Sequence, residues 1–387
     1  MIADNCFTAE SATEGHPDKM CDLIVDAVLD DVLRKDRFAR VELDAIAVTG
    51  MVLVSGEITT KKYVDINRVI RDTICDIGYD HCAPRFDCNS IAVLSVLEEQ
   101  SEEIALAVDR KGAGNQGVFV GFATDEARDL PIDAHCMPVP IHLAHALTAR
   151  LTQVRKEEIV HGLLPDGQAQ MTVEYGDGLP RRITHAAISG QHENAGSADR
   201  VRKELTEQVL RHVLEPTGLL TPETKLYANP AGPFTLGGPL VDVGLSGRKQ
   251  IDDCYGTICR HGGSSLSGKD PTKTDRSATY MARYVAKNIV AAKLALRCEI
   301  RIAYLIGVEE PISVQLSTYG TGQIPDERIL ALVRENFDLT TAGIIEHLNL
   351  RRPVYFATAC YGHFGRVGEG FTWEQTDMAE TLAAAAG

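Results

Sequence analysis

The sequence predicts an α+β fold built from more than one domain. Its 387 residues are enough for two or three separate hydrophobic cores. Segments with helical and strand-like patterns alternate irregularly, unlike a regular repeat of strand and helix. Glycine is concentrated at 112–117 and 232–268, and these stretches interrupt the regular elements. We therefore expect domain boundaries near 102–114 and 236, which gives domains at 1–102, 103–236 and 237–387.

Helical periodicity is clearest near the N-terminus. Between 21 and 33 the apolar residues recur on one face at helical spacing, and Pro17 suits the first position of that helix. A second helix is expected over 64–77, because its apolar pattern stops at Gly78, a residue type that often ends helices. By the same criteria, further helices are expected over 141–157, 198–214 and 277–296.

Other apolar segments have the length and composition of strands. Gly50 and Gly56 punctuate an expected pair of strands over 45–58, and 91–97 is expected to be a buried strand. The stretch 101–117 is polar and then rich in glycine, which suits a mobile loop. Further strands are expected over 171–175, 182–188, 299–305 and 312–318, and residues 360–377 are expected to be irregular.

The composition argues against several classes of protein. The net charge is −15, from 39 basic and 54 acidic side chains, which disfavours nucleic acid or a membrane surface as the partner. The sequence contains no run of about 18 apolar residues, so no membrane span is predicted. The first residues do not have the pattern of a signal peptide. We expect a cytoplasmic protein whose ten scattered cysteines are reduced and mostly buried.

Three segments concentrate residues that can perform chemistry. The first is Gly15-His16-Pro17-Asp18-Lys19, at the start of the first expected helix. The N–H groups at a helix N-terminus attract anions, so His16 is placed to donate to a phosphate and Asp18 to hold Mg²⁺. The alternative is an ordinary helix start, with Pro17 in the first turn. The segment alone leaves both interpretations open.

The other two segments, 237–249 and 261–276, bring cations and carboxylates into glycine-rich stretches. In an acidic chain this pattern suggests a polyphosphate with bound metal, because glycine lets the backbone approach a ligand closely. The alternative is a solvated face whose charges pair with one another. The charged residues concerned are Asp242, Arg248, Lys249, Lys269, Lys273, Asp275 and Arg276.

A P-loop is excluded at the third segment. Residues 263–269 fit the spacing GxxxxGK, but Asp270 stands where the magnesium-binding hydroxyl of Ser or Thr is required. Pro271 follows at once, where the helix of a P-loop would be running. A generic P-loop ATPase is therefore not expected.

Taken together, the motifs resemble those of the S-adenosylmethionine synthase (methionine adenosyltransferase) family. They are EGHPDK at 14–19, TGMVLVSGEITT at 49–60, GAGNQG at 112–117, GGP and GLSGRK within 237–249, and HGG and SGKDPTKTDRSA within 261–278. The match runs from residue 7 to residue 365. The resemblance implies three similar α+β domains related by pseudo-threefold symmetry. It also implies a dimer with shared active sites, arranged as a dimer of dimers.

The resemblance further implies a two-step reaction. The sulfur of L-methionine attacks C5′ of ATP and expels triphosphate, which is then hydrolysed to pyrophosphate and phosphate. Two Mg²⁺ ions per site and K⁺ are the implied cofactors. Fixed cations stabilise a departing polyphosphate, and holding the sulfur near C5′ removes an entropic barrier. A general base is not needed, because a thioether has no proton to lose.

Catalytic and nucleotide-binding roles follow from matching positions. Lys249, Lys269, Arg248 and His16 are the implied catalytic residues, since they match positions that hold the phosphate chain or the methionine carboxylate. Phe234 matches the aromatic residue that stacks on adenine. The implied ATP-binding residues are His16, Asp166, Gln168, Pro233, Phe234, Asp242, Arg248, Lys249, Ser265 and Lys269.

The methionine pocket, the metal sites and the gating loop are implied in the same way. Asp18 and Asp275 match magnesium ligands, while Asp44 and Glu10 fall near the potassium site. Residues 101–110 match a gating loop whose closure excludes water, with Gln100, Ser101, Val108, Asp109 and Arg110 as its named members. The implied methionine-binding residues are Glu57, Gln100, Asn115, Asp242 and Lys273.

Four positions depart from the family pattern. Gln168 replaces a lysine, Asn115 an aspartate, Pro233 an arginine and Asp44 a glutamate. The first two change the charge of the site, and a buried charge-assisted contact contributes roughly 1.5–3 kcal/mol. Alternatives to the ordinary synthase are therefore a specialised paralogue with another nucleophile or weak triphosphatase activity, and a catalytically silent nucleotide-binding partner subunit.

Overall fold

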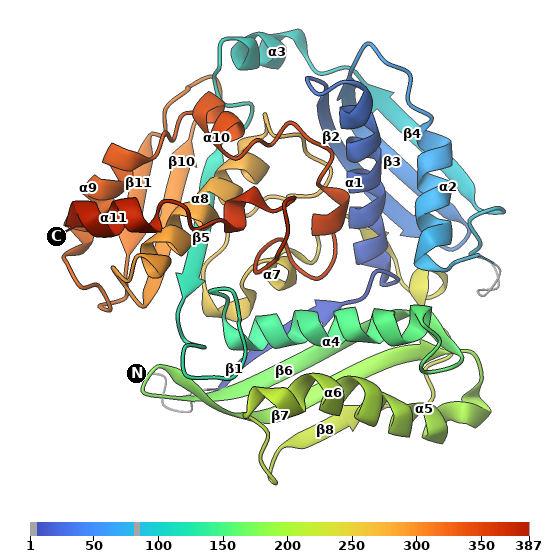
Figure 1. The fold of residues 1–387 in the computed structure, drawn as a ribbon. Coiled ribbons are helices and arrows are strands. Elements are labelled where there is room, and N and C mark those ends of the chain that lie inside the picture. The colour runs from blue at the N-terminus through green and yellow to red at the C-terminus, as the bar shows by residue number, and fades with distance from the viewer. Residues whose placement is uncertain (1–5, 81–85, 387) are drawn as a thin grey trace.

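The computed structural model describes residues 6–80 and 86–386. Within these residues the strands form three sheets of three or four strands, each packed against helices. The sheets and their helices make three α+β units around a common centre (Figure 1). The predicted α+β class with three units is confirmed. No helix of the described part is both long and apolar enough to cross a membrane.

The first sheet carries the start of the expected active site. Its strand order is β4-β3-β2-β9, with β2 and β3 antiparallel and β3 and β4 parallel. Helices α1 and α2 pack together, and α1 also packs on β2 and β9. The elements are α1 (Pro17–Lys35), β2 (Arg40–Val48), β3 (Met51–Thr59), α2 (Ile66–Ile77), β4 (Ala92–Glu98) and β9 (Gly244–Leu245).

The second sheet has the order β1-β6-β7-β8 and is built around a long antiparallel hairpin. Helix α4 packs against β1 and β6, and a second helical segment lies beside it (Figure 1). The elements are β1 (Cys6–Ala12), α4 (Val139–Lys156), β6 (Leu163–Gly176), β7 (Leu179–His192), α5 (Ala198–Leu205), a π-helical stretch (Thr206–Arg211), α6 (His212–Leu214) and β8 (Lys225–Ala228).

The third sheet, β11-β10-β5, packs on the long helix α8. Gly121 of β5 permits this contact, because a Cβ there would lie 2.0 Å from the backbone carbon of Ala282. Short C-terminal helices complete the unit. The elements are β5 (Gly117–Thr124), α8 (Thr274–Ala291), β10 (Arg297–Tyr304), β11 (Ser313–Ser317), α9 (Asp326–Asn336), α10 (Thr341–His347) and α11 (Ala379–Ala386).

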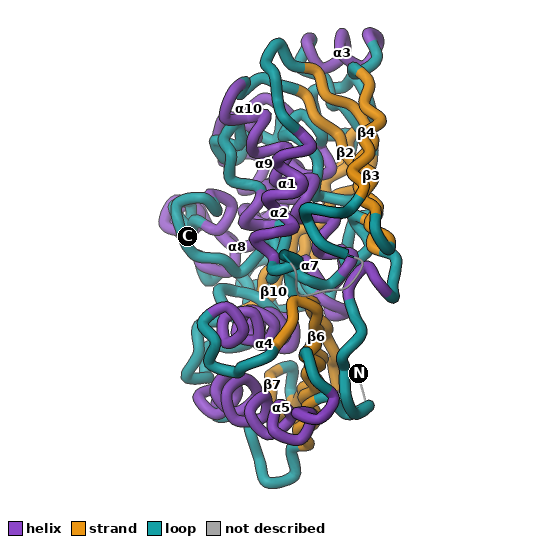
Figure 2. The backbone as a smooth tube through the Cα atoms, turned by 90° about the vertical axis from the view of Figure 1, so that its right-hand side faces the viewer, coloured by secondary structure: helices purple, strands orange, loops and turns teal. Residues whose placement is uncertain are grey.

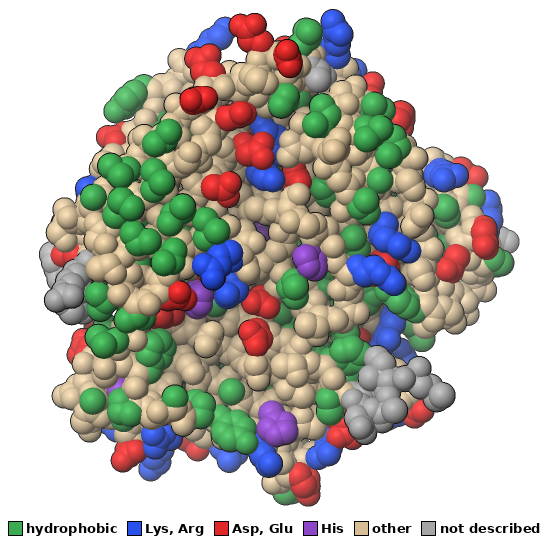
Figure 3. All heavy atoms as spheres, turned by 180° about the vertical axis from the view of Figure 1, so that it is seen from behind, with side chains coloured by type: hydrophobic (Ala, Val, Ile, Leu, Met, Phe, Trp, Pro, Cys, Tyr) green, Lys and Arg blue, Asp and Glu red, His purple; other side chains and the backbone are tan. Residues whose placement is uncertain are grey.

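Three strands connect the units across large distances in the sequence. Strand β1 pairs with β6, β5 pairs with β10, and β9 pairs with β2. Most helices lie on one side of the sheets, so the other side is largely uncovered (Figure 2). Apolar side chains gather on the uncovered side around a central area with charged and histidine side chains (Figure 3). The boundaries at 102 and 236 stay a prediction.

Two predictions from local pattern were wrong. The expected mobile loop contains helix α3 (Glu102–Asp109), which begins at Ser101, whose hydroxyl accepts a hydrogen bond from the backbone N–H of Ile104 at 3.4 Å. The sequence 102–109 is rich in helix-forming residues, and the glycines lie only after it. Strand β4 is not buried, because it lies at the edge of its sheet; Leu94 is 49% and Val96 is 59% exposed.

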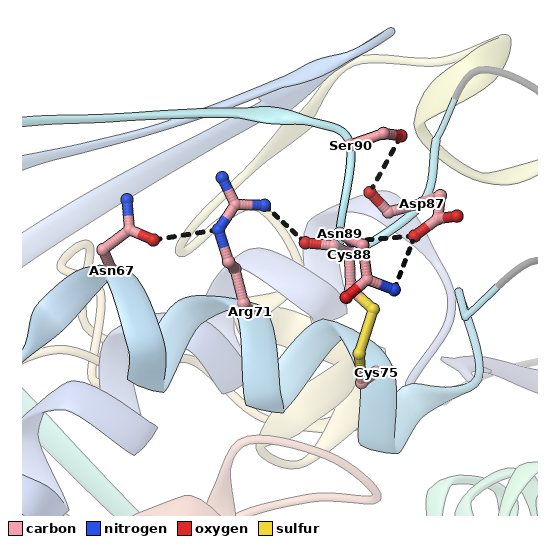
Figure 4. The surroundings of a disulfide bond; sticks show 7 residues. All are labelled: Asn67, Arg71, Cys75, Asp87, Cys88, Asn89 and Ser90. Carbon is pink, nitrogen blue, oxygen red and sulfur yellow. Dashed lines mark hydrogen bonds between the residues drawn. A yellow bond between two sulfur atoms is a disulfide. The ribbon is translucent and has the colours of Figure 1, made fainter.

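The cysteine prediction was also wrong at one place. Cys75, in the last turn of α2, forms a disulfide bond with Cys88 (Figure 4). No sequence motif marks this pair, because the two residues are 13 positions apart and meet only in the folded chain. The other described cysteines are free thiols, as expected.

A ladder of four buried aspartates on α1 holds the glycine-rich segments in place. Asp18, Asp22, Asp26 and Asp30 recur at every fourth residue, so they lie on one face of the helix, and none is more than 2% exposed. We call these four residues the aspartate ladder. A buried carboxylate needs hydrogen-bond donors or cations, and here residues from 245 onward supply most of them.

The first two carboxylates of the ladder hold the segment that follows β9. Asp18 accepts a hydrogen bond from the backbone N–H of Leu245 at 3.0 Å. Asp22 accepts a hydrogen bond from the backbone N–H of Gly247 at 2.8 Å. It also forms an ion pair with the ammonium of Lys19 at 2.9 Å. These contacts fix the backbone just before Arg248, one of the predicted phosphate-binding residues.

The other two carboxylates hold the start of α8 and the C-terminal segment. Asp26 accepts from the backbone N–H of Gly268 at 2.8 Å and forms a bidentate pair with the buried Arg276, both distances being 2.8 Å. Asp30 accepts from the backbone N–H groups of Tyr355 and Phe356, each at 3.0 Å. Burial raises the pKa of Asp30 to about 6.

We expect the substitution Asp26→Ala to lower the free energy of unfolding by about 3–5 kcal/mol, because it leaves the buried guanidinium of Arg276 without its partner. Denaturant unfolding measures this loss. Asp31→Ala on the same helix is the control. Asp31 pairs with the exposed Lys35, so its loss should cost less than about 1 kcal/mol. Equal losses for the two variants would contradict the importance of the ladder.

Candidate active site

The start of α1 and the segment after β9 form one charged cluster, which we call the helix-start cluster: His16, Asp18, Arg248 and Lys249. The ammonium of Lys249 lies 3.0 Å and the guanidinium of Arg248 lies 3.6 Å from the carboxylate of Asp18. Close packing of the two segments requires Gly244, where a Cβ would lie 2.2 Å from the carbonyl oxygen of Pro17. The structure thus joins residues that are more than 200 positions apart in the sequence.

A cavity of about 540 Å³ opens beside this cluster. Arg248 and Lys249 line it together with backbone from Gly247, and Glu10 of β1 and Asp252 lie at other parts of its wall. Burial raises the pKa of Asp252 to about 6. The cavity is large enough for a substrate, and it presents two fixed cations.

His16 is a neutral hydrogen-bond donor in this arrangement. Its Nδ1 accepts a hydrogen bond from the backbone N–H of Asp18 at 3.2 Å, which leaves the ring proton on Nε2. Burial, and then the charge of Lys249, lower the pKa of His16 to about 4. The imidazole at the N-terminus of α1 can therefore donate to an anion without carrying charge itself.

Next to the helix-start cluster, the side chains of Phe234 and Asp166 both pack against Gly237. The structure leaves no room for a side chain at Gly237, where a Cβ would lie 2.9 Å from Asp166 and 3.0 Å from the ring of Phe234. Asp166 accepts a hydrogen bond from the backbone N–H of Gly238 at 2.8 Å, and burial raises the pKa of Asp166 to about 6. Pro233, which precedes Phe234, is exposed.

A second charged cluster lies at the start of α8. We call it the α8 cluster: Glu42, Asn115, Lys269 and Asp275. The ammonium of Lys269 lies 3.5 Å from a carboxylate oxygen of Glu42 and 3.5 Å from one of Asp275. The side-chain amide of Asn115 also donates to Asp275. An aspartate at position 115 would place a second negative charge there, so the asparagine suits the buried carboxylate of Asp275.

Two further predicted methionine-binding residues, Glu57 and Gln100, lie near the α8 cluster. Glu57 is opposite Glu42 in the β2–β3 register. Gln100 accepts a hydrogen bond from Arg40 at 3.2 Å, and Arg40 also holds the carboxylate of Asp109 at the end of α3. This pairing attaches the predicted gating segment to β2. Asn115, at the start of the third sheet, completes the surroundings of Lys269.

Several other predicted residues have their polar groups occupied within the chain. The ammonium of Lys273 is buried and pairs with Asp270 at 3.2 Å. Asp242 accepts a hydrogen bond from the backbone N–H of Val243 at 2.8 Å, and its charge acts on His16. Ser265 donates to the carbonyl oxygen of Ser267 at 3.4 Å.

The predicted potassium residues, Asp44 and Glu10, both lie near the segment that follows β9. Asp44 accepts a hydrogen bond from the hydroxyl of Ser246 at 2.7 Å. Glu10 lines the same cavity as Arg248 and accepts a hydrogen bond from Gln170 at 2.7 Å. Gln168 is exposed on β6 and shares a smaller cavity of about 180 Å³ with Glu10.

The two charged clusters lie at different places along α1. Asp18 belongs to the helix-start cluster, whereas Asp26 holds Gly268 beside the α8 cluster. Eight residues of helix separate Asp18 from Asp26, which is about 12 Å along the helix axis at 1.5 Å per residue. Among the described side chains, no ion pair or hydrogen bond connects the clusters. One chain therefore presents these predicted site residues as two separate clusters.

Sequence reasoning missed the buried groups that support these clusters. Asp22, Asp26 and Asp30 were not singled out, and Lys19, which pairs with Asp22 and with Asp253, was given no role. The available signal was the spacing of four between acidic residues on an otherwise buried helix, which is unusual because charged groups are seldom fully buried without partners. The partners themselves could not be read from the sequence.

The carboxylates suit magnesium held mainly by a substrate. Among the described residues, there is no group of three or more His, Cys, Asp or Glu side chains that could hold a metal ion by itself. Mg²⁺ usually takes one or two carboxylates, with phosphate oxygens and water as its other ligands. Asp18 and Asp275 each offer a buried carboxylate of this kind beside a lysine.

Comparison with known proteins identifies the family. Models of the N-terminal, central and C-terminal domains of S-adenosylmethionine synthetase match residues 4–102, 110–234 and 236–375. The chain belongs to the S-adenosylmethionine synthetase family, and the resemblance seen in its motifs is confirmed. It is 50% identical to the S-adenosylmethionine synthase of Desulforudis audaxviator (strain MP104C), with 99% of each chain covered.

We expect Lys249→Met to raise the pKa of His16 above 4, because the substitution removes a positive charge that disfavours the imidazolium. The pKa should stay below 6.5, since burial is the larger cause and remains. Histidine NMR titration measures it. Lys293→Met, which removes an exposed lysine paired with Asp125, is the control. A pKa of His16 that does not change in the Lys249 variant would contradict the described geometry.

Proposed function

We infer that this protein is a methionine adenosyltransferase, which forms S-adenosylmethionine from ATP and L-methionine. Family membership over nearly the whole chain supports the inference. The observation that carries it in the structure is the helix-start cluster, where a neutral histidine donor and two cations meet beside a cavity. This arrangement suits the triphosphate chain of ATP. The alternatives of a silent subunit or a paralogue with another nucleophile are not favoured.

In our proposal the helix-start cluster holds the leaving group. Arg248 and Lys249 bind phosphoryl oxygens, and His16 donates its Nε2 proton toward the oxygen that leaves C5′. The sulfur–C5′ bond forms as the C5′–oxygen bond breaks, and the electron pair leaves with triphosphate. These donors are fixed before the reaction, so they stabilise developing charge without the cost of reorganisation.

The adenine and methionine ends use the neighbouring residues. Phe234 offers its ring to the base beside Asp166, and the α8 cluster with Glu57 and Gln100 receives methionine. Lys269 lies between two carboxylates, where it can bind a phosphate or the methionine carboxylate. Asn115 provides an uncharged amide beside Asp275. Gln168, Pro233, Asp242, Ser265 and Lys273 remain predicted substrate contacts.

Metal ions complete the charge balance of the proposed site. Mg²⁺ held by Asp18 and Asp275 would neutralise the triphosphate, which carries more negative charge than Arg248 and Lys249 can offset. For K⁺ we propose Asp44, which accepts a hydrogen bond from Ser246, and Glu10, which lines the same cavity as Arg248 and Lys249. The cytoplasmic location stays a prediction.

We propose that the functional unit is a dimer with shared active sites, and a dimer of dimers remains the predicted assembly. The two half-sites in one chain support sharing, because the helix-start cluster of one chain can be completed by the α8 cluster of its partner. The uncovered sheet faces offer an apolar surface for this contact, as apolar patches on a protein surface often do. Exposed apolar side chains on or beside these strands include Leu94, Val96, Val118, Leu305, Ile306 and Ile312.

We expect purified protein with ATP, L-methionine, Mg²⁺ and K⁺ to produce S-adenosylmethionine over many turnovers, detected by mass spectrometry. Lys269→Ala should slow the reaction by about a hundredfold, because one fixed cation at the developing charge is lost. Lys293→Ala, at a lysine that is 73% exposed, should leave the rate unchanged. Absence of S-adenosylmethionine with the unmodified protein would refute the proposed function.

We expect two inactive variants to restore activity to each other. Lys249→Ala damages one half-site and Lys269→Ala the other, so a mixed dimer contains one intact shared site. Random mixing of subunits should recover about a quarter of the normal rate. The control pairs Lys249→Ala with Arg248→Ala, which damage the same half-site and should not complement. A mixture of the first pair that stays inactive would argue against shared sites.

A further inference from the structure

Tyr79, which follows the last residue of α2 and its Gly78 cap, is held in place near the helix-start cluster. Gly78 ends α2 in the left-handed conformation, with φ of 110°. Cys75, one turn earlier, forms the disulfide bond with Cys88 (Figure 4). The backbone N–H of Cys88 also donates to the carbonyl oxygen of Tyr79 at 2.9 Å. Tyr79 is therefore held between the end of a helix and a covalent bond.

The side chain of Tyr79 extends from this point to the proposed catalytic segment. It is only 1% exposed, and its hydroxyl donates to the carbonyl oxygen of Gly15 at 2.7 Å. Gly15 directly precedes His16. On its other side, Gly15 lies so close to Pro165 that a Cβ would be 2.3 Å from that residue. The backbone before His16 is thus confined between Pro165 and the hydroxyl of Tyr79.

The same hydroxyl also contacts the nucleotide side of the site. A Cβ at Gly238 would lie 2.2 Å from the hydroxyl oxygen of Tyr79, so that position accommodates only glycine. The N–H of Gly238 is in turn the donor to Asp166. Tyr79 therefore touches the segment before His16 and the segment beside Phe234, the two parts that must be aligned to hold one nucleotide.

An external dithiol would approach the disulfide from the side of Cys75. Cys75 is partly exposed, whereas Cys88 is buried. A dithiol would transfer two electrons and two protons, so that Cys75 and Cys88 become thiols and the dithiol becomes a disulfide. Arg71 would still hold this region, because it donates to the carbonyl oxygen of Cys88 (Figure 4) and to that of Ile91. Reduction should therefore loosen Tyr79 without unfolding the unit.

We propose that Tyr79 is a positioning residue for His16 and that the Cys75–Cys88 disulfide holds Tyr79 in place, so that turnover depends on the redox state of this pair. The proposal rests on the proposed function. Neither Tyr79 nor the disulfide touches substrate in this proposal. The disulfide acts only through Tyr79, and Tyr79 acts only through the backbone at Gly15 and Gly238.

The test compares the oxidised protein with protein reduced by dithiothreitol. Tyr79→Phe keeps the buried ring and removes only the hydroxyl, so kcat should fall about fivefold, the factor that one ordinary hydrogen bond gives, while the KM for methionine changes little. Reduction should lower kcat of the unmodified protein by up to the same factor. Tyr63→Phe, at a tyrosine that is 82% exposed, is the matched control and should behave like the unmodified protein.

The decisive comparison is reduction of the Tyr79→Phe variant. If the disulfide acts through Tyr79, reduction should not slow this variant further, and Cys75→Ser should show a low rate that dithiothreitol does not change. An equal loss on reduction with and without the hydroxyl would overturn the proposal. An unchanged kcat in Tyr79→Phe, or free thiols at both cysteines in peptide mass spectra of the oxidised protein, would also overturn it.

Hydrogen–deuterium exchange separates this proposal from the proposed function. On reduction, the backbone amides around His16 should exchange faster, while those in the middle of α8 should not change. This readout needs no turnover. Protein that makes no S-adenosylmethionine but shows this local change would refute the function and keep the redox-dependent positioning. Active protein with unchanged exchange around His16 would refute the positioning alone.

Discussion

The structure depends on the neutralisation of buried carboxylates along one helix. The aspartate ladder of α1 would be very unfavourable without partners, because each carboxylate leaves water on folding. Backbone N–H groups, Lys19, Lys249 and Arg276 supply those partners, and most of them come from the segments 244–249 and 268–276. Folding of the glycine-rich segments onto α1 is therefore required for α1 itself to be buried, and that requirement places the proposed phosphate-binding cations.

Glycine makes this arrangement sterically feasible at a few positions. Gly244 and Gly268 lie against backbone carbonyl oxygens, where a Cβ would be 2.2 Å away in each case. Such contacts allow N–H groups to reach the ladder directly. The glycine-rich segments are thus ordered parts of the structure, held by α1, and their composition reflects close approach as well as the phosphate binding that we propose.

In our proposal, the separation of the two charged clusters gives a dimer a chemical role. The helix-start cluster and the α8 cluster are each assembled within one chain, yet the α1 residues beside them, Asp18 and Asp26, are about two turns apart. The uncovered sheet faces lie on the side of the molecule opposite most helices (Figure 2). In our proposal the partner chain brings the missing half-site across this surface, so assembly and catalysis are coupled.

Much of the local structure could be predicted from pattern. The helices around 21–33, 64–77, 141–157 and 277–296 are present, because long apolar periodicity reports burial of one face. Helix α3 was missed, because the loop prediction for 101–117 relied on the glycines that follow the helix. Strand β4 was expected to be buried but lies exposed at a sheet edge. An apolar run indicates a strand that favours burial, but it does not indicate whether the same chain or another surface provides the cover.

The sequence by itself determined the family, the α+β class and the residues that carry the proposed chemistry, because ordered motifs specify which side chains are available. Only the tertiary structure decided which of them meet. It joined Asp18 to Lys249, separated both from Lys269, placed Tyr79 against Gly15 and formed the Cys75–Cys88 bond. Such pairings depend on contacts between residues far apart in the chain, and local patterns carry little information about those distances.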